Sequence, residues 1–101
     1  MTIMPRDVAL YTIDTLPVQE HLGLVTFWVR DQSLDVAEQR ALAGLRERAA
    51  ALGADAVIGV RITVENEMAV VSESPRGMSQ VLVSSVSAYL VHVSGSAAVR
   101  A

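Results

Sequence analysis

The sequence predicts an α+β fold, in which a mainly antiparallel sheet carries one long helix on one face and ends in a long C-terminal hairpin. Three observations predict it. Residues 34–52 repeat apolar side chains at three- and four-residue steps, which is typical of one helix lying on a sheet. Alternating segments precede and follow this helix, and residues 72–77, Ser-Glu-Ser-Pro-Arg-Gly, form a turn between two of them. A chain of 101 residues has room for one domain, residues 1–101.

Two strands are expected before the helix. Residues 8–13 form a short alternating segment, and the pair Leu16-Pro17 then breaks the chain. Residues 18–30 alternate over a longer stretch, with apolar side chains on both faces in the middle, so we expect a strand covered on two sides. Gly23 would weaken a regular strand and marks either a bulge or a close backbone approach.

The helix has clear start and stop signals. Either Ser33 or Asp35 can cap its first turn, the latter with Glu38 at capping-box spacing. Gly53 stands where a left-handed residue ends a helix. The predicted buried stripe is rich in alanine, which allows a close approach to the sheet; it consists of Leu34, Ala37, Ala41, Leu42, Leu45, Ala49 and Leu52.

After the helix we expect two more strands. In residues 56–65, strict alternation places five apolar side chains on one core face: Ala56, Ile58, Val60, Ile62 and Val64. Residues 78–93 form a long returning strand in which neither face carries the charged side chains of a solvent-exposed sheet. One helix cannot cover both sides of this sheet, so one apolar face is left for association.

The composition limits the classes of partner that are expected. Hydrophobic residues make up 51% of the chain and the mean hydropathy is +0.39, which is high for a small domain and favours a subunit interface. The net charge is −3, and the eight basic residues, all arginine, form no stripe, so nucleic acid is not an expected partner. We find neither an export signal nor an apolar span of membrane length, and expect a cytoplasmic protein without membrane contact.

The expected partner is therefore a second copy of the chain. Closed cyclic assembly would bury the uncovered sheet face in every subunit. On the last strand the predicted interface residues are Val81, Val83, Tyr89 and Val91, which alternation places on one face.

Three stretches of the chain resemble the YbjQ-like family of bacterial domains, which carries a heavy-metal-binding label. They are Thr-Leu-Pro-Val-Gln-Glu-His-Leu-Gly-Leu-Val at 15–25, Arg-Ala-Ala-Ala-Leu-Gly-Ala-Asp-Ala-Val-Ile-Gly-Val at 48–60, and Val-Ser-Gly-Ser-Ala-Ala-Val-Arg at 93–100. The resemblance implies an α+β fold and a homo-oligomer, with pentameric rings as the form associated with the family. Members usually carry a helical insertion after the opening strand, whereas here residues 29–33 pass almost directly into the long helix.

Candidate chemical sites are few. His21 and His92 are the two imidazoles, and sheet pairing could bring them together with Glu20 as a metal site. Zinc needs three or four ligands in tetrahedral reach, and the chain has no cysteine to supply them. The alternative is that both histidines are packed or exposed at strand ends. Asp55 is expected to tie the turn after the helix by accepting from backbone donors.

Catalytic groups are not apparent. No serine lies in a Gly-x-Ser-x-Gly elbow, and Val93-Ser94-Gly95-Ser96 is not a phosphate loop because no helix follows it. Trp28 and Tyr89 could wall a small-ligand pocket, although core or interface packing explains both. We therefore expect a non-enzymatic homo-oligomer without catalytic residues or a bound cofactor. The alternative is a protein that binds a metal or small ligand through His21, His92 and nearby carboxylates.

Overall fold

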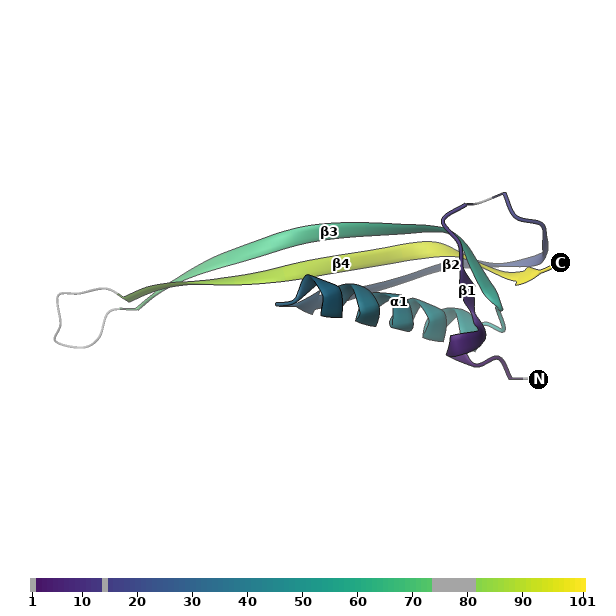
Figure 1. Ribbon diagram of the computed structural model, residues 1–101, viewed down its shortest axis with the longest axis horizontal. Coiled ribbons are helices and arrows are strands. Elements are labelled where there is room, and N and C mark those ends of the chain that lie inside the picture. Colours follow the sequence, from purple (N-terminus) through teal and green to yellow (C-terminus); the bar gives the residue numbers. More distant parts are fainter. Residues whose placement is uncertain (1, 14, 74–81) are drawn as a thin grey trace.

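A computed structural model describes the backbone of residues 2–13, 15–73 and 82–101, and their side chains except those of 68–73 and 82–87. The described elements, in chain order, are η1 (Pro5–Asp7), β1 (Ala9–Leu10), β2 (Val18–Asp31), α1 (Leu34–Ala51), β3 (Ala56–Glu73) and β4 (Leu82–Arg100). Figure 1 shows α1 lying along one face of the sheet and the β3–β4 hairpin extending well beyond it. This arrangement confirms the predicted α+β class, the single long helix and the C-terminal hairpin.

The four strands form one sheet in the order β1-β3-β4-β2. β4 pairs antiparallel with both of its neighbours, and β1 adds a short parallel pair to the start of β3. The helix lies over β2 and β4 and barely contacts β3. We call the side of the sheet beneath α1 the helix face and the opposite side the open face.

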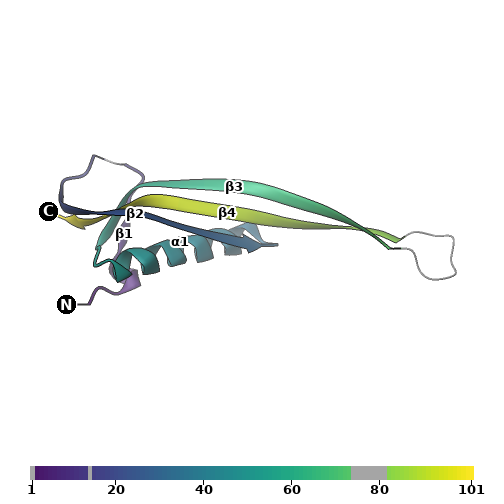
Figure 2. The same ribbon diagram turned by 180° about the vertical axis from the view of Figure 1, so that it is seen from behind.

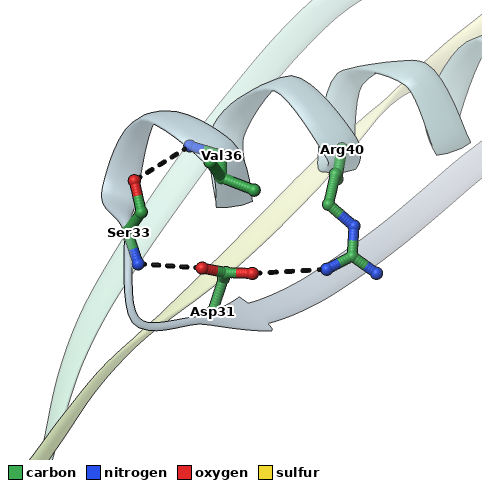
Figure 3. Close-up of polar contacts among 4 residues, drawn as sticks. All are labelled: Asp31, Ser33, Val36 and Arg40. Atoms are coloured by element: carbon green, nitrogen blue, oxygen red, sulfur yellow. Dashed lines mark hydrogen bonds and ion pairs between the residues drawn. The ribbon is translucent and has the colours of Figure 1, made fainter.

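The connection from β2 to α1 explains why the chain passes directly from strand to helix. Ser33 is the N-cap: its Oγ accepts a hydrogen bond from the Val36 backbone N–H at 3.4 Å, and its own N–H donates to Asp31 Oδ1 at 2.9 Å (Figure 3). Asp31 also receives Arg40 Nη1 at 3.4 Å. The cap is therefore Ser33 rather than Asp35, and no helical insertion lies between β2 and α1.

The helix ends as its sequence predicts. Gly53 has φ +85°, and its N–H donates to the Ala50 carbonyl at 2.9 Å. The next residue, Ala54, donates to the Ala49 carbonyl at 3.0 Å, so the two bonds form a Schellman motif. One part of the predicted stripe is wrong: Leu52 is 49% exposed, because the helix has already ended at Ala51 and turns toward β3.

The core lies between α1 and the helix face. Leu45 is fully buried, and the small side chains Ala37, Ala41 and Ala49 bring the helix backbone close to the sheet. Their partners on the strands include Val25, Val29, Val57, Val91 and Val93. Gly44 allows the closest approach, because a Cβ at this position would overlap the ring of Phe27.

A β-bulge in β3 overturns the predicted single core face of this strand. The register with β4 slips between Ile58 and Arg61, and Gly59 has φ +62°. Val57 and Val60 therefore point to the helix face, whereas Ile58 points to the open face. Beyond the bulge Ile62 and Val64 lie opposite buried Val93 and Val91, yet they are 48% and 42% exposed, since α1 lies mainly over β2 and β4.

A second bulge lies in β2. The register slips between His21 and Gly23, and Gly23 has φ +121°, so of the two alternatives expected for this glycine the bulge is present. Its effect is to place His21 on the same open face as Leu24, whereas simple alternation separates them. From Leu24 to Asp31 the predicted alternation holds.

The hairpin makes the molecule long. β2 ends opposite Tyr89, so β3 and β4 continue beyond it as a two-stranded ribbon paired from Glu67–Ala88 to Glu73–Leu82. Figure 2 shows that this ribbon extends past the ends of α1 and β2. The radius of gyration is 19.4 Å and the longest extent 69 Å, against about 13 Å for the radius of gyration of a compact domain of this length.

Candidate functional site

The two histidines lie far apart within one chain. His21 pairs with Ala98 of β4, whereas His92 belongs to β4 itself and lies opposite Trp28. The two positions, Ala98 and His92, are six steps apart along β4, which corresponds to roughly 20 Å along an extended strand. Glu20 is exposed and lies beside His21, at the distant end of β2 from His92. Sheet pairing therefore does not bring the predicted ligands together, because the histidines occupy opposite ends of the β2–β4 ladder.

No group of three or more histidine, cysteine, aspartate or glutamate side chains able to hold a metal ion occurs among the described residues. A metal ion at either histidine would need ligands from elsewhere. Metal binding by His21, His92 and Glu20 therefore stays a prediction.

The predicted interface residues fall in different environments. Val91 is completely buried beneath α1 and offers no surface to a partner, which corrects its assignment as an interface residue. Tyr89 is half-buried on the same helix face, opposite Asp31. Val83 lies in the hairpin ribbon opposite Ser72, with its side chain outside the described part, and Val81 lies outside the described residues altogether.

The open face carries the exposed apolar surface instead. Leu24 is 72% exposed and Trp28 61%, both on β2. Leu90 and His92 of β4 lie beside Trp28 and complete this apolar patch. Trp28 and Tyr89 point to opposite faces of the sheet, so they cannot wall one pocket. Val91 and Tyr89 therefore lie on the helix face, whereas Leu24 and Trp28 are exposed on the opposite side of the sheet, and association through either face stays a prediction.

An ion pair bridges the open face. Arg30 Nε lies 3.0 Å from Glu67 Oε2, and Arg30 Nη2 donates to Glu67 Oε1 at 3.2 Å. The pair connects β2 to the start of the hairpin ribbon across β4, with both side chains about half exposed. Such an exposed pair adds little stability, roughly 0–1 kcal/mol. It connects the end of β2 to the first residue pair of the ribbon.

Asp55 has a different role from the predicted turn contact. Its Oδ1 accepts the Arg100 backbone N–H at 2.9 Å, and its Oδ2 lies 3.6 Å from Arg100 Nε. A side-chain hydrogen bond to Tyr11 and the charge of Asp55 raise the pKa of Arg100 above its usual value. The Asp55 carboxylate therefore binds the C-terminal end of β4 instead of the backbone donors of its own turn.

A cavity of about 690 Å³ opens on the open face near both bulges. Its base is formed by β4, where Ser94, Gly95 and Ser96 leave little side-chain volume, and its rim includes Arg61 and His21. Thr12 borders it from the segment after β1, which is held to β3 by the Gly59 N–H to Ile13 carbonyl bond at 2.9 Å. Sequence reasoning missed Arg61, since its place in the same cavity lining as His21 depends on two register shifts.

The fold and surface define a small α+β domain with one helix-covered sheet face, one open face and an extended hairpin. The sequence matches the family model described as "Putative heavy-metal-binding" (YbjQ) over residues 30–99, and the chain belongs to that family. Two of the three resembling stretches overlap this range, whereas residues 15–25 precede it. No curated protein matches the sequence significantly.

A solved structure has the same fold. It is a protein of unknown function from Pediococcus pentosaceus that belongs to the DUF74 family, and it superposes with a TM-score of 0.68. The alignment covers 93% of this chain and 98% of that chain at 16% sequence identity, so it supports the fold alone. Among the described residues, no helix is long and apolar enough to cross a membrane.

Proposed function

We propose that this chain is the non-enzymatic subunit of a homo-oligomer that closes into a ring, with five subunits as the preferred number. The observation that carries the proposal is the β3–β4 ribbon. Seven residue pairs of the hairpin extend past the end of β2, without a third strand beside them in the described part of the chain. An isolated two-stranded hairpin is marginally stable in water. Packing against a neighbouring subunit would stabilise it.

Exposed apolar side chains on both sheet faces also support association. Trp28 and Leu24 lie on the open face, while Ile62 and Val64 lie on the helix face beside α1. Burying a side chain of this size contributes about 1.5–3 kcal/mol. Residues that remain exposed in one chain on two sides of the same sheet fit a subunit that contacts two neighbours.

The unpaired edges of the sheet offer a way for such contacts to close into a ring. β2 (Val18–Asp31) pairs with β4 along one edge, and its other edge has no neighbour among the described strands. The outer edge of β3 is paired near its start and is free of strand partners from Arg61 onward in the same part of the chain. In a ring, β2 of one subunit would lie beside β3 of the next, a head-to-tail contact that closes by rotation. The number five follows from the family resemblance.

The alternative role is binding of a metal ion through His21, His92 and Glu20. Its support is the description of the family alone, because the two histidines lie at opposite ends of the β2–β4 ladder within one chain. Elemental analysis of protein purified without an affinity tag tests it directly. Stoichiometric zinc or another heavy metal, lost in a His21→Ala/His92→Ala variant, would favour this role; a metal-free native oligomer would remove it.

Sedimentation of the wild type and two variants tests the ring. Trp28→Glu introduces charge into the exposed patch of the open face and should dissociate the assembly without unfolding the subunit. Val36→Glu is the matched control, because Val36 is 42% exposed on the far side of α1 and tolerates an acid in the first turn of a helix. Loss of assembly in the control, or its retention in Trp28→Glu, would place the interface elsewhere.

A further inference from the structure

We propose that the cavity beside Arg61 binds a small oxyanion, either a carboxylate or a phosphate group. The cavity has about 690 Å³, which lies within the usual range for small-molecule sites. All of its lining residues come from one chain, so its chemistry can be argued without the ring, and Leu24 belongs both to this lining and to the exposed apolar surface of the open face.

The charge of the lining selects the ligand class. Arg61 and His21 lie on the rim, and neither an aspartate nor a glutamate is among the lining residues. Arg61 forms no ion pair with any carboxylate in the described part of the chain. A guanidinium without a local counter-charge binds carboxylate or phosphate in a planar, bidentate fashion. A metal cation would find no carboxylate ligand here.

Neutral donors surround the cation. Thr12, Ser94 and Ser96 bring three hydroxyl groups to the cavity, and within the described residues their side chains have no hydrogen-bond partner. A hydroxyl can donate to an oxyanion without any change in its protonation state. Because Ser94 and Ser96 stand two apart on β4, they face the same side of the sheet, opposite Arg61 and Ile58 respectively.

The two bulges build this geometry. The Gly59 bulge returns the β3 side chains to the open face at Arg61, directly opposite Ser94. The Gly23 bulge places His21 on the same face. Without either slip, alternation would direct one of these two side chains to the helix face. Bulges recur beside binding sites because they redirect side chains in this way.

Isothermal titration calorimetry at constant ionic strength tests the site, with inorganic phosphate and acetate as separate probes. Saturable binding of phosphate alone identifies a phosphate site, and of acetate alone or of both a carboxylate-accepting one; each supports the proposal. Arg61→Gln should weaken binding at least tenfold, since it removes the charge-assisted bonds. Ser94→Ala/Ser96→Ala should weaken it severalfold while leaving Arg61 in place.

Arg6→Gln is the control, because it makes the same charge change at an exposed residue of η1, outside the cavity lining. Its affinity should stay within twofold of the wild type. Circular dichroism establishes that each variant is folded. Absence of saturable binding by either probe to the folded wild type overturns the proposal, and so does equal weakening in Arg61→Gln and Arg6→Gln.

Discussion

The ring of Phe27 on β2 occupies the space that a side chain at position 44 of α1 would need. Arg48, one helical turn on, lies over the same ring, with its guanidinium carbon 5.2 Å from the ring centroid. The pairing explains a glycine in the middle of an 18-residue helix. Glycine costs about 1 kcal/mol there relative to alanine, and the close contact between helix and sheet offsets that cost.

Gly44→Ala should therefore lower stability despite the better helix propensity of alanine. Overpacking a core contact costs about 1–3 kcal/mol, which exceeds the propensity gain of about 1 kcal/mol at the upper end of that range. Urea unfolding measures the change. A Phe27→Leu background should recover part of the loss because it opens the space. A rise in stability of Gly44→Ala alone would show that the Phe27 ring can move aside without cost.

The cap at the start of α1 gives a second prediction. Ser33→Ala removes the acceptor for the Val36 N–H (Figure 3) and should cost about 1 kcal/mol in the free energy of unfolding. Asp35→Ala should cost clearly less, because Asp35 is not the cap. Chemical denaturation of both variants checks this ranking, and the reverse order would return the cap to Asp35.

Asp55 should protect the C-terminal end of β4. Asp55→Ala removes the acceptor of the Arg100 N–H and the partner of its side chain. Hydrogen exchange at Arg100 and the last residues of β4 should accelerate severalfold, while the amides beneath α1 change little, because the contact is local. Glu20→Ala serves as a control for removing an exposed carboxylate nearby. Uniform acceleration across the whole chain would instead assign Asp55 a global role.

Much of this fold follows from local sequence signals. The alternation from Leu24 to Asp31, the helical spacing after Ser33 and the left-handed Gly53 each depend on residues close in the chain, and each is confirmed. The bulge at Gly59 does not follow, and at Gly23 a bulge was only one of two alternatives, because a glycine in a strand permits a register shift without requiring it. One slip at Gly59 moved Ile58 and Ile62 to opposite faces.

The candidate site was less predictable for the same reason. Whether His21 shares a site with His92 or with Arg61 depends on the pairing of distant strands, and periodicity does not fix that register. The face covered by the helix was also open to choice, since both faces of β4 are apolar. Val91 was therefore expected at an interface, although it packs beneath α1.

Val91 and Trp28 give the sharpest contrast between core and surface. Val91→Asp places a charge in a fully buried site without a partner and should unfold the subunit. Trp28→Glu changes a residue that is 61% exposed and should leave the circular dichroism spectrum of the subunit intact. A folded Val91→Asp protein would contradict the placement of α1 over β4.

The mass of the native protein in solution tests the central claim most directly. Sedimentation equilibrium at micromolar concentration should give a particle several times the 10.8 kDa of one chain, with five copies as the preferred number. Trp28→Glu should sediment as a folded species of lower mass. A wild-type protein that is strictly monomeric at that concentration would contradict the ring and the packing of the hairpin ribbon against a neighbouring subunit.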